Sequence, residues 1–62
     1  MSERGMQVGR YIAGIRNQAK RGYAHDVADA LWNGRPLPER PANLGTMAAQ
    51  AVEMRLRELV TA

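Results

Sequence analysis

The chain has 62 residues, no cysteine, one histidine and a net charge of +3. Disulfides and thiolate metal sites are excluded, and a single histidine falls short of the about three or four ligands that a metal site needs. No stretch reaches the about 20 apolar residues of a membrane span, and residues 1–10 lack the apolar core of a signal peptide, so we expect a soluble, cytoplasmic protein without cofactor or membrane partner.

A first helix is predicted to begin at Ser2 or Met6 and to run to Arg21. Ser2 can cap the free amides of its first turn, and Gly22 is a typical residue for ending a helix. Lys20 and Arg21 complement the negative end of the helix dipole. Apolar residues recur at the spacing of one helical face: Val8, Tyr11, Ile12, Ile15 and Ala19. We therefore expect a long N-terminal helix that is kinked or broken at Gly22.

A second helical stretch is predicted from His25 to Asn33, with Val27, Ala30 and Leu31 on its inner face. Asn33 and Gly34 are a natural stop signal. All 3 prolines of the chain follow between Arg35 and Pro41. Proline removes backbone donors and fixes φ, so this segment is predicted to be a stiff, extended loop.

The last helix is predicted to begin at Asn43 or Thr46 and to end near Val60. Glu53 and Arg57 are expected to form an outward ion pair along it. Its expected apolar face consists of Met47, Ala48, Ala51, Val52, Leu56 and Leu59. The predicted fold is thus an all-α helical hairpin, a single domain over residues 1–62. Because so short a chain buries only about 60% of its surface, we expect two hairpins to pair into a homodimeric bundle.

Catalysis is not predicted, because the hydroxyl residues are better explained as helix caps or terminal residues. His25 and Asp29 are four residues apart and could face one metal ion, but two ligands do not make a site. Acidic residues at the start of a helix have a simpler explanation in the helix dipole. We therefore expect a non-enzymatic, regulatory binding protein.

The positive charge is concentrated at the N-terminal end of the chain. Residues 1–21 contain five basic residues and one acidic residue, a net charge of +4, whereas residues 22–62 contain four basic and five acidic residues, a net charge of −1. A solvated helix face would look the same, but the asymmetry also indicates a polyanion or an acidic protein surface as partner. The candidate nucleic-acid-binding residues are Arg10, Arg16, Lys20 and Arg21, which would form a broad basic side suited to phosphate contact without sequence readout.

A helix-turn-helix is not predicted. That motif joins its helices by a turn of about three or four residues, whereas here the whole segment from Trp32 to Asn43 intervenes. Tyr11 and Tyr23 are expected to be mostly core residues, although both lie next to basic residues and can stack on bases.

The alternative function is docking on a larger host or partner protein, as a small helical inhibitor or adaptor of the kind that phages encode. Trp32 either covers the core, with Pro36 or Pro38 on its ring, or is an exposed anchor at an interface, where tryptophan is enriched. The candidate partner-binding residues are Trp32, Arg35 and Arg40.

Overall fold

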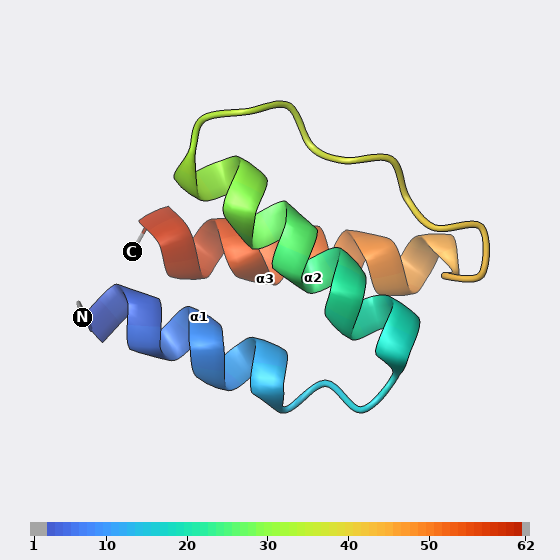
Figure 1. The fold of residues 1–62 in the computed structure, drawn as a ribbon, viewed down its shortest axis with the longest axis horizontal. Coiled ribbons are helices and arrows are strands. Elements are labelled where there is room, and N and C mark those ends of the chain that lie inside the picture. The colour runs from blue at the N-terminus through green and yellow to red at the C-terminus, as the bar shows by residue number, and fades with distance from the viewer. Residues whose placement is uncertain (1–2, 62) are drawn as a thin grey trace.

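The protein folds into three α-helices in the computed structural model, which describes residues 3–61 (Figure 1). They are α1 (Glu3–Ala13), α2 (Gln18–Trp32) and α3 (Thr46–Thr61). A short turn joins α1 to α2, and residues 33–45 form a long loop between α2 and α3. The all-α prediction is confirmed, with no strand among the described residues. The predicted cap at Ser2 lies outside them.

The break in the N-terminal helical region lies between Gly14 and Asn17, so the break predicted at Gly22 is wrong. α1 ends in a turn in which the amide of Gly14 donates to the carbonyl of Arg10 at 3.1 Å. Asn17 is extended (φ −69°, ψ 123°), and its side-chain oxygen accepts a hydrogen bond from the amide of Lys20 at 2.9 Å. Asparagine in this conformation is a preferred N-cap, so a new helix begins at Gln18.

Gly22 lies inside α2, exposed and with a negative φ. The four-residue steps from Ala19 through Tyr23 and Val27 to Leu31 rotate around a straight helix, which suggested a break. In the folded chain, α2 contacts both α1 and α3. Its buried residues can therefore cover a wide arc of its surface, and no break is needed to absorb the rotation.

The stop signal at the end of α2 is confirmed. Gly34 has a φ of +66°, a left-handed conformation that glycine adopts without strain. The amide of Arg35 donates to the carbonyl of Ala30 at 2.8 Å, and that of Asn33 donates to the carbonyl of Asp29 at 3.0 Å. The bond from Arg35 is that of a Schellman motif, which satisfies free carbonyls at a helix C-terminus.

α3 begins at Thr46, one of the two predicted starts, and its inward face keeps half of the expected residues, Val52, Leu56 and Leu59. Met47 is 80% exposed, and Ala51 is also exposed. The buried residues are Ala49, Val52, Glu53, Leu56 and Leu59. These positions follow the three- and four-residue spacing of a single face.

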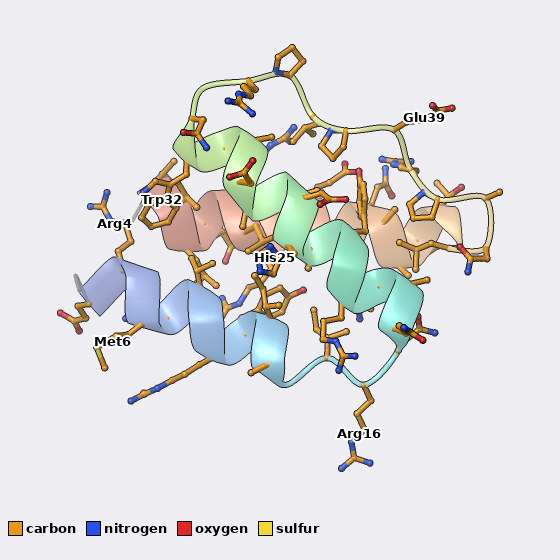
Figure 2. All side chains as sticks on the ribbon, viewed as in Figure 1. Arg4, Met6, Arg16, His25, Trp32 and Glu39 are labelled. Atoms are coloured by element: carbon orange, nitrogen blue, oxygen red, sulfur yellow. The ribbon has the colours of Figure 1, made fainter. Side chains whose placement is uncertain are left out.

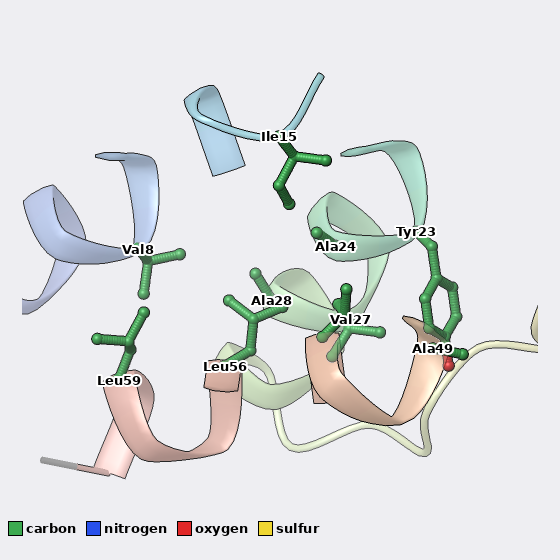
Figure 3. Packing of buried hydrophobic residues seen from close by; sticks show 10 residues of the cluster. Val8, Ile15, Tyr23, Ala24, Val27, Ala28, Ala49, Leu56 and Leu59 are labelled. Carbon is green, nitrogen blue, oxygen red and sulfur yellow. The ribbon is translucent and has the colours of Figure 1, made fainter. Parts of the chain in front are cut away.

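The core lies between the three helices, each of which packs against the other two (Figure 3). Its fully buried large side chains are Val27 from α2 with Val52 and Leu56 from α3. α1 lies on the side away from the long loop and contributes Val8 to the core, and the turn after it contributes Ile15. Leu37 and Leu44 of the loop pack against the same cluster. No helix in residues 3–61 has the length and apolar character needed to cross a bilayer.

Candidate nucleic-acid interface

A buried carboxylate holds the proline-containing loop against α2 and α3. The Tyr23 hydroxyl donates to Glu53 Oε2 at 2.5 Å, and Arg40 donates from Nε to Oε2 at 2.9 Å and from Nη2 to Oε1 at 3.0 Å. These hydrogen bonds, first from Arg40 and then from Tyr23, lower the pKa of Glu53. Burial, and then the hydrogen bond with Glu53, raises the pKa of Tyr23. We call Tyr23, Arg40 and Glu53 the closed cluster.

The closed cluster contradicts the prediction that Glu53 forms an outward ion pair with Arg57. Glu53 is only 8% exposed, and its partner is Arg40 of the loop. Arg40 was predicted to bind a partner, but two of its nitrogens are already bonded to Glu53 within the chain. The signal that the sequence contained was the position of Glu53 between Ala49 and Leu56, at four- and three-residue steps on the inward face of α3.

Three of the four predicted nucleic-acid-binding residues meet at the corner between α1 and α2. Arg10 comes from the last turn of α1, Arg16 from the connecting turn and Lys20 from the first turn of α2. All three line one shallow depression, together with Tyr11 and Asn17. Figure 2 shows the Arg16 side chain pointing away from the helices. We call Arg10, Arg16 and Lys20 the basic corner.

The turn at residues 14–17 changes how these charges are arranged. On one continuous helix they would have spread over a broad side, with Arg21 pointing the same way as Arg10. In the folded chain Arg21 is exposed on α2 but does not line the depression. The turn therefore brings Arg10, Arg16 and Lys20 to one depression, which Arg21 does not line.

A second shallow depression adjoins the basic corner. It is lined by Gln7, Arg10 and Tyr11 of α1 and by Arg55 and Leu59 of α3. Burial raises the pKa of Tyr11, and the nearby positive charge of Arg55 opposes that rise. Arg55 was missed as a candidate because only the packing of α1 against α3 brings it to Arg10.

Within residues 3–61, no carboxylate forms an ion pair with the basic corner. Arg35, Arg40 and Arg55 each form an ion pair, with Asp29, Glu53 and Glu58 respectively. Arg10, Arg16, Lys20 and Arg21 form none with the residues in the described range 3–61. Within this range no Asp or Glu lines either depression. The positive potential at the corner is therefore left uncompensated, which favours a polyanionic ligand.

A groove between α1 and α2 forms a further exposed concave surface. Val8, Gly9 and Ile12 line it from α1, and His25, Ala28 and Trp32 line it from α2. Trp32 is 50% exposed at the end of α2 and is not part of the buried core (Figure 2). The interpretation that the Trp32 side chain covers the hydrophobic core is therefore wrong. We call this surface the Trp32 groove.

The remaining candidate residues lie at the edge of the Trp32 groove. Asp29 lines it, and Arg35 Nη1 lies 3.9 Å from Asp29 Oδ2, with both side chains mostly exposed. His25 and Asp29 share the groove, but in the described part of the chain no three His, Cys, Asp or Glu side chains form a group able to hold a metal ion.

Comparisons with protein-family models, with curated proteins and with solved structures found no match to this chain.

Proposed function

We propose that this protein is a small, non-enzymatic regulatory protein that binds nucleic acid through the basic corner. The observation that carries the proposal is that Arg10, Arg16 and Lys20 line one depression that no carboxylate of residues 3–61 lines. These side chains come from three consecutive segments, α1, the turn and α2. Backbone phosphates present a dense row of negative charges, and neutralising them releases bound counterions.

The contacts proposed are to phosphates rather than to base edges. Arginine and lysine that contact phosphates position a protein on nucleic acid without reading its sequence. With three contacts, binding to duplex DNA is expected to weaken with salt at a logarithmic slope of about −3. Arg21 is exposed beside Lys20 in the sequence and adds to the same potential, whereas Arg55 is paired with Glu58.

The test is a charge reversal at the corner matched by one elsewhere. The double variant Arg16→Glu, Lys20→Glu is compared with Arg35→Glu, Arg57→Glu, which changes the net charge equally at positions that line neither basic depression. We expect the corner variant to lose at least about tenfold in affinity for a labelled oligonucleotide at low salt and to flatten the salt slope by about 2. The control is expected to bind nearly as the wild type does.

Two outcomes would contradict the assignment. An equal loss in both double variants would mean that net charge alone drives binding, with no particular site. Full binding by the corner variant would remove Arg16 and Lys20 from the interface.

The second candidate function is docking of a larger host or partner protein in the Trp32 groove, as an inhibitor or adaptor. The observation in its favour is the half-exposed Trp32 at the rim of an apolar groove, with Met6 of α1 45% exposed. Exposed tryptophan is a frequent anchor at interfaces. Binding of this kind is expected to change little with salt and to fail in Trp32→Ala, whereas phosphate binding would show the opposite pattern.

The homodimer stays a prediction. A single chain already buries Val27, Val52 and Leu56 completely, so pairing is not needed to cover these residues. Light scattering of the purified protein measures the mass directly. A dimer would support pairing through an exposed surface such as the Trp32 groove, and a folded monomer would end that prediction.

A further inference from the structure

Tyr11 lies between the two depressions of the basic surface. It lines the first together with Arg10, Arg16 and Lys20, and the second together with Arg10 and Arg55. An aromatic ring therefore lies with cationic side chains on both sides. Because its pKa is raised by burial, its hydroxyl is neutral at physiological pH and adds no negative charge to this surface.

Packing against the core restricts the Tyr11 ring. Tyr11 is half-buried and packs against the hydrophobic core, while part of it borders both hollows. A ring fixed in this way loses little conformational entropy when a ligand stacks on it. Proteins that bind single strands combine cationic grooves along the backbone with aromatic side chains on which bases stack.

We infer that the preferred ligand of the basic corner is single-stranded nucleic acid, with one base stacked on Tyr11 and the neighbouring phosphates on Arg10, Arg16 and Lys20. This inference rests on the proposed function and narrows its ligand. In a duplex the faces of the bases are covered by their neighbours, so a duplex offers Tyr11 phosphates and sugars but no free π-face. Stacking is tolerant of sequence, in agreement with a site proposed to contact phosphates rather than base edges.

The experiment compares three probes of equal length: a mixed-sequence single strand, the duplex of that sequence, and a strand of abasic residues that keeps the phosphates but lacks the bases. Affinity is measured by fluorescence anisotropy at low salt for the wild type, Tyr11→Leu and Tyr11→Phe. Leucine preserves an apolar contact with the core but cannot stack, whereas phenylalanine preserves the ring. Trp32→Leu is the matched control, since Trp32 lines neither basic depression.

We expect the wild type to bind the normal single strand about tenfold more tightly than the abasic strand, the ratio that a single stacked base supplies. Tyr11→Leu is expected to abolish that ratio without changing the affinity for the abasic strand, and Tyr11→Phe and Trp32→Leu to preserve it.

Equal binding of all three probes, unchanged in Tyr11→Leu, would overturn the stacking inference and leave phosphate binding intact. Tighter binding of the duplex would overturn the preference for single strands. Absence of binding to every probe at low salt would instead refute the proposed function itself. If Tyr11→Leu fails to fold by circular dichroism, the wild-type ratio between normal and abasic strands and its retention in Tyr11→Phe still decide the question.

Discussion

Tyr23 and Tyr11 each lie beside arginine, but in opposite surroundings. In the closed cluster, Tyr23 and Arg40 share one buried carboxylate, Glu53, and their charges and hydrogen bonds are satisfied within the chain. At the basic corner, Tyr11 lies among Arg10, Arg16 and Lys20, and no carboxylate lines the depression that they share within residues 3–61. Similar side chains therefore stabilise the fold where a carboxylate pairs with them. Where no carboxylate pairs with them, they leave a positively charged surface that an anion can approach.

The largest expected effect is the loss of the carboxylate from the closed cluster. Glu53→Ala leaves the Tyr23 hydroxyl buried without an acceptor and Arg40 without its partner. Because Arg40 is 39% exposed and can turn to water, we expect a loss of about 2 kcal/mol in the free energy of unfolding rather than the larger cost of a fully buried pair.

Chemical denaturation measures this loss, and Glu58→Ala on the same helix is the control. Glu58 is exposed and bonded to Arg55 at 3.2 Å, so its removal is expected to cost at most about 0.5 kcal/mol. Equal effects of the two variants would mean that Glu53 is no more important to the fold than a surface residue.

A smaller effect is expected from removing one hydroxyl in each region. Tyr23→Phe deletes one hydrogen bond of the closed cluster while Arg40 still pairs with Glu53, so we expect a loss of about 1 kcal/mol in unfolding free energy. Tyr11→Phe is expected to change it by less than about 0.5 kcal/mol, since no hydrogen bond of the Tyr11 hydroxyl stabilises the fold. Thermal unfolding of both variants makes the comparison, and a larger loss in Tyr11→Phe would reverse the roles assigned to the two regions.

Lowering the pH is expected to remove part of the stabilisation that the Glu53 carboxylate provides. The folded pKa of Glu53 is lowered by Arg40 and Tyr23, so its contribution is fully present above the unfolded pKa of about 4.3 and is lost as the pH falls through the folded pKa. The gap in stability between the wild type and Glu53→Ala should therefore narrow in acid. A gap that stays constant from neutral pH to acid would show that the carboxylate is not stabilised in the folded state.

The smallest effect is expected from a substitution that tests whether α2 is continuous through Gly22. Gly22 is exposed within α2, and a Cβ atom there would meet nothing within 4 Å. Gly22→Ala is expected to raise the free energy of unfolding by about 0.5 kcal/mol, because glycine is the more flexible residue in the unfolded chain. Thermal unfolding measures the change. A marked destabilisation would mean that the chain bends at Gly22 after all.

Local sequence signals predicted part of this structure well. Asn33 and Gly34 end α2, the segment with the three prolines is a loop, and Thr46 begins α3. These features depend on the backbone preferences of a few adjacent residues, so they can be recognised without knowing the rest of the fold. The break predicted at Gly22 lies instead between Gly14 and Asn17, because Asn17 caps a new helix there and Gly22 stays within α2.

The candidate site was predicted only in part. Arg10, Arg16 and Lys20 were recognised from the charge asymmetry, but Arg55 and the place of Tyr11 between two basic hollows follow from the packing of α1 against α3. Trp32 was identified as a candidate anchor, and the structure leaves it half exposed.

The sequence by itself determined that the chain is helical, where α2 ends and where α3 begins, and that its positive charge lies toward the N-terminus. Those properties come from residue composition and from interactions between near neighbours. Only the tertiary structure decided which charges are neutralised, because Glu53 meets Arg40 and Tyr23 through the packing of the loop, α2 and α3. The chain also turns back at Gly14 to Asn17, and among the described residues no carboxylate lines the basic corner.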